Sequence, residues 1–360
     1  MAESHSEADS PVLGLHHITL VTSNEEVNRR FYTEILGLRR VKLTVNQDDV
    51  FHRHLFYAND RAETGSAITF FEWPYLPKGT VGLTSPHHLS YAVERLEALP
   101  KWRSWLLSQR ISVIGPLARD GRISLYLRDP DGVVVEITKL VEEEVTQSYI
   151  DELIHEPSPT VEISSDMKLR SFDHASPVTL NSEVTIKFLN KTLGLKTTSK
   201  RTNPDQKQVS ILGIGNDQKP DFLRYLASPG APLGDVGTGS IHHIAMAVAD
   251  DSAQQTILRR LNASGVSNSG VIDRFWFKSV YFRDPDGNLL EIATKGPGYG
   301  ADESPESLGS RLVLAPWLES RRDQIEGALR ELDARNAHSW PPDYLTTPTQ
   351  PEALPDQATA

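Results

Sequence analysis

The sequence predicts an α+β fold of four βαβββ units, which pair into two curved-sheet barrels and are followed by a C-terminal helix. Two observations support this fold class: an internal repeat across most of the 360 residues, and a strand–helix–strand pattern common to its units. A third is size, because one unit of roughly 55–70 residues exposes a sheet face that it cannot cover alone. We therefore expect the units to pair across their open faces and to enclose cavities.

The repeat is visible in two pairs of segments. Residues 87–140 begin HHLSYAV and contain YLRDPDGVVVEIT, whereas residues 242–295 begin HHIAMAV and contain YFRDPDGNLLEIAT; the offset from 87 to 242 is 155 residues, without a gap. Upstream, HHITLVT and RFYTEILGL match DHASPVT and KFLNKTLGL, and the offset from His17 to His174 is 157 residues. The four units therefore begin near residues 14, 86, 171 and 240.

Each unit begins with a short strand and a helix and continues with extended segments. In the first unit Ser23 and Glu26 have the spacing of a capping box, so we expect the helix to begin there. One helical face then carries an apolar stripe at i, i+4 and i+8, formed by Val27, Phe31 and Ile35, and Gly37 is expected to end the helix. Residues 66–73 and 124–138 read as strands, the latter bent at an Asp-Pro-Asp-Gly turn.

The segments outside the units divide the chain further. Residues 13–140 and 168–297 each hold two units, and residues 141–167 between them read as an acidic linker with one short helical possibility. Residues 298–336 form a C-terminal extension whose amphipathic helix is marked by Leu318, Ile325, Leu329 and Leu332. We expect disorder in residues 1–12 and 337–360, the latter because five prolines fall in the 23 residues from His338 onward.

Composition excludes several classes of function. The net charge of −11 without a basic stripe argues against nucleic acid as a partner. No apolar run approaches the roughly 18–20 residues of a membrane span, and the first residues do not resemble a signal peptide, so we expect a soluble cytoplasmic protein without a membrane partner. We also expect a homo-oligomer.

The absence of cysteine excludes disulfides, thiolate metal sites and a thiol nucleophile, so any metal must be held by histidine or carboxylate.

Histidine doublets occur at the start of three units: His16–His17, His87–His88 and His242–His243. Neighbouring side chains on a strand point to opposite faces, so we expect only one histidine of each doublet to enter a cavity. The third unit has a single histidine, His174, which aligns with the second position of the doublets. The second histidines are therefore candidate metal ligands. The alternative, a hydrogen-bonded core histidine, is weakened because the position recurs in all four units.

Two glutamates in apolar strands complete the candidate ligand sets. Glu136 lies in VVVEITK and Glu291 in LLEIATK, where a buried charge costs several kcal/mol unless a metal or another cation compensates it. A structural salt bridge is the alternative interpretation. Two histidines and one glutamate can occupy one face of an octahedral metal and leave three positions open, as in non-haem Fe(II) oxygenases. Zinc on the same ligands would instead suit hydrolysis or proton transfer.

An arginine and a tyrosine precede each glutamate at fixed spacing. Arg274, Tyr281 and Glu291 repeat the spacing of Arg119, Tyr126 and Glu136. Antiparallel pairing of the strands on either side of the turn could bring the tyrosine and the glutamate into one cavity. There the arginine could hold an anionic oxygen and the tyrosine could donate a proton, although core packing and a surface ion pair remain alternatives. The RDPDG residues are interpreted as turn chemistry.

These features resemble a known superfamily. The four βαβββ units with the HHITL, DPDG…E and LGL motifs are similar to the vicinal oxygen chelate superfamily of glyoxalases, bleomycin-resistance proteins and extradiol dioxygenases. More narrowly, TVNQDDVFHRHLFY, TGSAITFFEWP, HHIAMAV, KSVYFRDPDGNLLEIAT and LAPWLESRRDQIE resemble hydroquinone-type ring-cleaving dioxygenases over roughly residues 14–330. The resemblance implies Fe(II) held by His17, His243 and Glu291. It also implies substrate-binding roles for His16 and Thr19 and catalytic roles for His242, Arg274 and Tyr281.

Counting ligands leaves the pairing of the units open. Pairing the first unit with the fourth gathers His17, His243 and Glu291, and leaves a second triad of His88, Glu136 and His174. Tandem pairing would instead gather His17, His88 and Glu136 on one side and His174, His243 and Glu291 on the other. The resemblance implies the first arrangement. We then expect the second triad to be a remnant of the repeat rather than a second active centre.

The resemblance implies an Fe(II)-dependent dioxygenase that opens a hydroquinone-type aromatic ring with O₂ and needs no coenzyme. In this hypothesis Arg274 orients the substrate oxygen, and Tyr281 or His242 supplies a proton during ring opening. One alternative is another enzyme of the superfamily, such as a glyoxalase-like isomerase or a catechol extradiol dioxygenase. Another is a metal-independent protein that binds an aromatic or antibiotic ligand.

Overall fold

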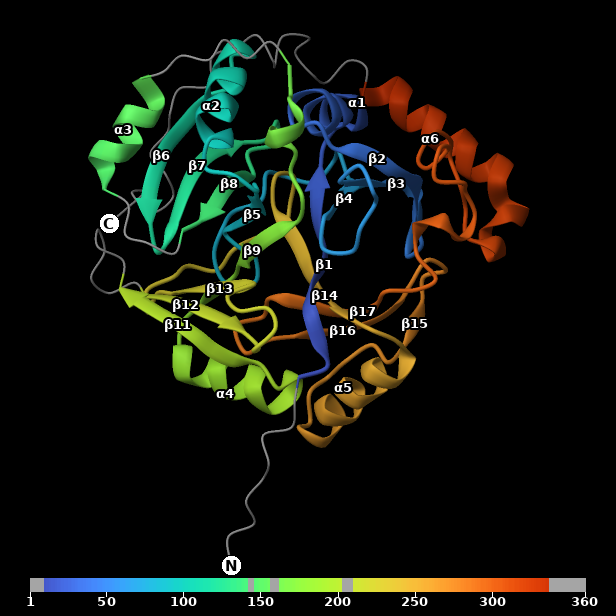
Figure 1. Cartoon of the computed structure of the whole chain (residues 1–360). Helices are drawn as coiled ribbons and strands as arrows, with labels where there is room; N and C mark the ends of the chain where they lie inside the picture. Colours follow the sequence, from blue (N-terminus) through green and yellow to red (C-terminus); the bar gives the residue numbers. More distant parts are fainter. Residues whose placement is uncertain (1–9, 142–145, 156–161, 203–209, 337–360) are drawn as a thin grey trace, which may run out of the picture.

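The protein contains two curved mixed sheets, each assembled from two of the repeated units (Figure 1). The computed structural model describes residues 10–141, 146–155, 162–202 and 210–336. One sheet combines the first unit with the fourth, in the order β15-β16-β17-β14-β1-β4-β3-β2. The other combines the third with the second, in the order β11-β12-β13-β9-β5-β8-β7-β6, with β10 beside β13. The α+β prediction and the pairing of first with fourth are confirmed, and tandem pairing is excluded.

The strand bounds follow the repeat. The first sheet comprises β1 (Val12–Thr22), β2 (Arg39–Asn46), β3 (Asp49–Ala58), β4 (Ala67–Glu72), β14 (Ile241–Val248), β15 (Ile272–Asp273), β16 (Lys278–Arg283) and β17 (Leu289–Thr294). The second comprises β5 (His88–Ala92), β6 (Val113–Arg119), β7 (Arg122–Arg128), β8 (Val134–Leu140), β9 (Phe172–Ser176), β10 (Val178–Thr179), β11 (Lys196–Thr202), β12 (Ser210–Gly215) and β13 (Leu223–Ala227). A seam of two antiparallel strands joins the units within each sheet, β1 with β14 and β5 with β9.

Helices cover the outside of the sheets, as Figure 1 shows. They are α1 (Glu25–Arg30), which continues as a π-helical turn η1 (Phe31–Ile35), α2 (Ala98–Ser108), α3 (Gln147–His155), α4 (Ser182–Leu193), α5 (Asp251–Ala263) and α6 (Arg322–Asn336). Short 3₁₀ turns are η2 (Ser165–Met167), η3 (Tyr299–Ala301) and η4 (Pro316–Arg321). Among the described residues, no helix is long and apolar enough to cross a membrane.

The first helix begins one residue later than the capping-box pattern predicts. Asn24 is the N-cap, and its side-chain oxygen accepts a hydrogen bond from the Val27 amide at 3.0 Å. Ser23 does not cap because its hydroxyl donates to Asp131 of the second unit at 2.5 Å. The predicted capping box is therefore wrong, and a contact between units decides the start of the helix.

The two Asp-Pro-Asp-Gly turns connect the sheets as well as turning the chain. Asp129 accepts the Val133 amide inside its own turn at 2.8 Å, as the turn interpretation requires. Asp131 reaches across to Thr22 at the end of β1, at 2.6 Å. In the other turn, Asp286 accepts the Leu180 amide of the third unit at 3.0 Å. The second aspartate of each turn thus binds the neighbouring barrel, a role that turn chemistry alone did not indicate.

The remaining predicted segments are described in part. The helical possibility in the linker is α3, whereas residues 142–145 and 156–161 lie outside the described residues. Residues 1–9 and 337–360, which make up most of the two predicted disordered ends, also lie outside them; β1 begins at Val12. In the C-terminal extension Leu318 lies in η4, before the predicted amphipathic helix α6. It packs in one buried cluster with Val45, Leu314, Ile325 and Leu329.

Candidate metal centre

The registers of four neighbouring strands bring three distant residues into one row. His17 on β1 pairs with Ala245 on β14, Ala245 pairs with Glu291 on β17, and Glu291 pairs with Tyr281 on β16. Ala245 has only a methyl group, so the longer side chains on either side of it can meet above the sheet. His243 lies two residues before Ala245 and points to the same face. The predicted antiparallel pairing of the strands that carry Tyr281 and Glu291 is confirmed, with the two residues opposite each other.

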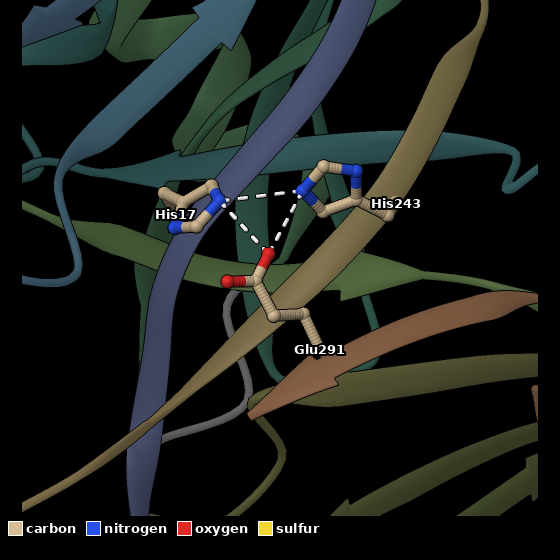
Figure 2. Close-up of side chains that lie close together, drawn as sticks. All are labelled: His17, His243 and Glu291. Carbon is tan, nitrogen blue, oxygen red and sulfur yellow. Dashed lines mark hydrogen bonds and ion pairs between the residues drawn. The ribbon is translucent and has the colours of Figure 1, made fainter. Parts of the chain in front are cut away.

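The structure gathers the ligand atoms of His17, His243 and Glu291 at one point (Figure 2). The two Nε2 atoms are 3.3 Å apart, and Glu291 Oε2 lies 3.3 Å from Nε2 of His17 and 3.0 Å from Nε2 of His243. All three side chains are buried. Glu291 Oε1 accepts the Ser279 hydroxyl at 2.5 Å, whereas Oε2 has no hydrogen-bonding partner among the described residues.

This triangle fits a divalent metal ion. Atoms that each lie about 2.0–2.2 Å from one ion, at angles between octahedral and tetrahedral, are about 2.8–3.6 Å apart. The three observed separations of 3.0–3.3 Å fall inside that range. A buried carboxylate oxygen without a donor is costly, and a bound cation would satisfy it. Two imidazoles and one carboxylate suit Fe(II), Mn(II) or Zn(II), so the donor set supports a metal without fixing its identity.

The first histidine of each doublet holds the second in place. The Nδ1 atoms of His16 and His17 are 2.9 Å apart, and those of His242 and His243 are 2.8 Å apart. A histidine that offers Nε2 to a metal carries its proton on Nδ1 and donates it to an acceptor. Burial, together with the neighbouring histidine of each doublet, lowers the pKa of His16 and His242 to about 3, so both are neutral acceptors near pH 7. The doublets are therefore pairs of a candidate ligand and its orienting partner.

The charge at the centre favours an ionised glutamate. Burial alone would raise the pKa of Glu291, but attraction from His17 and His243 outweighs it and holds the pKa well below its usual value. Burial and the charge of Glu291 raise the pKa of Tyr281. Near neutral pH the carboxylate is available as a ligand and the phenol keeps its proton.

A cavity of about 400 Å³ is lined by two of the three candidate ligands, His17 and His243, whereas Glu291 is not part of its lining. Aromatic rings make up much of its wall, and polar and charged side chains line it beside them, as in many small-molecule sites. The lining residues are His17, Val45, Asn46, Gln47, Asp48, Asp49, His54, Phe56, Phe71, Trp73, His242, His243, Arg274, Trp276, Phe277, Tyr281 and Leu289.

The predicted catalytic residues line this cavity, and the predicted substrate-binding residues do not. His242, Arg274 and Tyr281 are all in the lining. The expectation that only one histidine of a doublet enters a cavity is therefore wrong for His242 and His243, because the close Nδ1 contact brings both rings to the same side. His16 lies behind His17, and Thr19 shares a hydrogen bond with Thr69 at 2.8 Å below the cavity surface.

Several lining residues were not predicted from the sequence. His54 on β3 contacts the Thr69 hydroxyl through Nε2 at 3.0 Å, and burial lowers its pKa well below the usual value. Asp48 accepts two hydrogen bonds from the Arg274 guanidinium, at 3.1 and 2.7 Å, and that guanidinium lies 5.4 Å from the Tyr281 ring centre. The alternation of FHRHLFY places His54 and Phe56 on one face, a signal that could have indicated His54.

A family profile and several related proteins are similar to this chain over most of its length. A profile described as the Glyoxalase/Bleomycin resistance protein/Dioxygenase superfamily matches residues 14–137 and 171–292. MhqA of Bacillus subtilis (strain 168), provisionally named a ring-cleaving dioxygenase, is 32% identical over 324 residues, which span 89% of this chain and 99% of MhqA. The chlorohydroquinone/hydroquinone 1,2-dioxygenase of Sphingobium indicum is 29% identical over 330 residues, 87% of this chain and 95% of that protein.

Solved structures agree on the fold. A crystal structure of a Bacillus subtilis protein, provisionally described as a dioxygenase, superposes with a TM-score of 0.75 at 30% identity and covers 89% of this chain and 97% of its own. Glyoxalase I from Zea mays, at 17% identity, has a TM-score of 0.56 and covers 78% of this chain and 92% of its own, which shows the fold alone. The chain therefore belongs to the glyoxalase/bleomycin resistance protein/dioxygenase superfamily, among its ring-cleaving dioxygenases.

Proposed function

We propose that the protein is an Fe(II)-dependent dioxygenase that opens the ring of a hydroquinone-type substrate with O₂. The observation that carries the proposal is the His17, His243 and Glu291 triangle, two of whose members line a cavity of about 400 Å³ with many aromatic side chains in its wall. The cavity volume lies at the small end of the range for ligand pockets and suits a single substituted ring. The name of the Sphingobium relative supports the substrate class.

In this proposal the ligand triad binds the metal, and aromatic side chains of the cavity wall contact the substrate ring. Fe(II) held by His17, His243 and Glu291 would supply the redox chemistry that lets O₂ react with the ring. Phe71, Trp73 and Phe277 offer flat apolar surface against a ring and exclude water from it. His16 and Thr19, which lie outside the lining, act as supports: His16 orients His17, and Thr19 fixes the Thr69 hydroxyl that contacts His54.

Three polar side chains act on the substrate oxygens. Arg274 is held by Asp48 and carries a permanent positive charge that neutralises an anionic oxygen. Tyr281 keeps its phenolic proton near neutral pH and can donate it when negative charge develops. His242 accepts the Nδ1 proton of His243, so its own proton is on Nε2, where it forms a second donor to the cavity.

Replacing Tyr281 by phenylalanine is expected to lower kcat about 10²-fold because a proton donor is lost, and to change KM far less. The matched control is Tyr126→Phe, at the corresponding position of the other barrel, with a kcat within about twofold of the unmodified protein. Steady-state kinetics with a hydroquinone measures both variants. Equal losses of kcat in the two variants would contradict the assignment of Tyr281.

Oxygen uptake tests the function itself. The protein is loaded with Fe(II) without oxygen, and O₂ consumption is followed with hydroquinone, methylhydroquinone, chlorohydroquinone and catechol. We expect one O₂ consumed per ring opened, fastest with the hydroquinones. No uptake with any of them at full iron occupancy would contradict the proposal. A preference for catechol would favour a catechol extradiol enzyme, and turnover without O₂ on zinc or nickel would favour an isomerase.

A further inference from the structure

We propose that His88, Glu136 and His174 form a second divalent-metal site, in the other barrel, which stabilises that barrel and does not cleave rings. The triad lies at the seam of β5 and β9, which corresponds to the seam of β1 and β14 in the first sheet. This site is independent of the ring-cleavage proposal, because it is defined by a metal and not by a substrate.

The second triad repeats the register of the first. His174 on β9 pairs with Ser90 on β5, Ser90 pairs with Glu136 on β8, and Glu136 pairs with Tyr126 on β7. Ser90 takes the place of Ala245 as the small residue between the two long ligands. His88 lies two residues before Ser90, as His243 lies two before Ala245. The backbone that assembles the first centre is thus present twice.

The ligand atoms of the second triad are as close as those of the first. The two Nε2 atoms are 3.3 Å apart, and Glu136 Oε2 lies 3.3 Å from His88 Nε2 and 3.2 Å from His174 Nε2. These separations are within the range of about 2.8–3.6 Å expected for three ligands of one ion. A divalent cation with the size and ligand preference that suit the first centre would therefore also fit between these three atoms.

Glu136 provides an independent indication of a bound cation. Its side chain is 2% exposed, and its Oε1 accepts the Tyr126 hydroxyl at 3.2 Å. Its Oε2, which points at the two imidazoles, has no hydrogen-bonding partner among the described residues. A buried carboxylate oxygen in that state is destabilising unless a positive charge is bound to it.

Both histidines of the triad are oriented as metal ligands. The Nδ1 atom of His88 lies 2.7 Å from Nδ1 of His87, and Nδ1 of His174 lies 2.7 Å from Asp173 Oδ2. Asp173 is itself held by Arg122 at 2.7 Å. A carboxylate or imidazole on Nδ1 lets Nε2 of each ring face the metal position. Asp173 occupies the position that His16 has in the first unit, which explains why the third unit has a single histidine.

The surroundings of the second triad do not suit an aromatic substrate. Arg122 occupies the repeat position of Phe277, which packs against His17 in the first centre with ring centres 5.3 Å apart. Arg224 on the adjacent strand β13 is also buried and pairs with Asp120 at 3.0 Å. The Ser176 hydroxyl lies 3.3 Å from His88 Nε2. The ion-paired Arg122 stands where the first cavity has the aromatic ring of Phe277, so the ligand class is a divalent transition-metal ion with water and not a metal with an arene.

Metal stoichiometry tests the site. The full chain is stripped of metal, loaded with Fe(II) or Zn(II), dialysed and analysed by mass spectrometry of the elements. We expect two equivalents per chain, and one in either Glu136→Gln or its matched control Glu291→Gln. Glu136→Gln should keep its kcat for ring cleavage, whereas Glu291→Gln should lose it. Metal should also raise the melting temperature of Glu291→Gln, whose remaining metal lies in the second barrel.

Two results would overturn the proposal. The first is one equivalent in the unmodified protein that is retained by Glu136→Gln and lost by Glu291→Gln. The second is loss of ring cleavage in Glu136→Gln in parallel with its metal. If Glu136→Gln does not fold, calorimetric titration of the stripped unmodified protein with Zn(II) decides: two equivalents support the second site, and one equivalent contradicts it.

Discussion

Replacement of His243 by alanine is expected to lower kcat for ring cleavage by at least about 10³-fold, equivalent to about 4 kcal/mol of transition-state stabilisation. The variant loses one of the three atoms that surround the metal position, at 3.0 Å from Glu291 Oε2, and leaves that oxygen with one imidazole neighbour. Metal analysis should show one equivalent less than in the unmodified protein. The fold should persist, because His243 lies in a strand whose neighbours on β1 and β17 remain paired.

His88→Ala is the matched control, since His88 occupies the same register position in the other barrel. It should also lose one metal equivalent, yet keep kcat within about twofold. Kinetics and metal content measured on both variants separate the two centres. If His88→Ala abolished turnover and His243→Ala did not, the catalytic metal would belong to the other barrel.

Replacement of Lys42 by methionine is expected to destabilise the protein by about 3–5 kcal/mol, because it leaves the buried Glu303 carboxylate without its cation. Lys42 is fully buried on β2, and its Nζ lies 2.5 Å from Glu303 Oε2 and 2.7 Å from Asp302 Oδ1. It also donates to the Tyr299 carbonyl at 2.9 Å. This lysine therefore ties the C-terminal extension to the first sheet. Urea unfolding, followed by circular dichroism, measures the loss.

The same replacement is expected to disturb the cavity beside the candidate metal centre. Lys42 Nζ lies 5.2 Å from the centre of the Trp276 ring, and the Trp276 indole donates to Asp302 at 3.0 Å. Trp276 is part of the cavity wall. The double variant Lys42→Met/Glu303→Gln should recover part of the stability, because it removes the acidic group left unpaired. A loss below about 1 kcal/mol in the single variant, or no recovery in the double, would contradict this role.

The fold and the candidate ligands could be predicted from the sequence because both recur in an internal repeat. A position that recurs in four units points to a common place in the fold, and the single histidine of the third unit selects the second residue of each doublet. The pairing of the units could not be decided from the ligand residues alone, because both arrangements give two histidines and one glutamate per barrel. Only the register of β1 against β14, which pairs His17 with Ala245, distinguishes them.

The features that the sequence did not predict depend on contacts between distant segments. Ser23 satisfies the capping pattern, but Asp131 from the second unit binds its hydroxyl, so Asn24 caps the helix instead. His54 and Asp48 reach the cavity through the β2–β3 hairpin, whose position depends on the curvature of the sheet. In the sequence, nothing distinguishes Lys42 from other polar residues of a strand, because its acidic partners lie about 260 residues away.

A crystal structure of the protein loaded with Fe(II) and soaked with hydroquinone in the absence of oxygen tests the central claim most directly. Anomalous scattering at the iron edge should give a peak within about 2.0–2.2 Å of Nε2 of His17, Nε2 of His243 and Oε2 of Glu291. The aromatic ring should lie in the cavity near Phe277, with one oxygen facing the iron and Arg274. An iron-free triangle in fully loaded crystals, or a hydroquinone bound away from this cavity, would contradict the account.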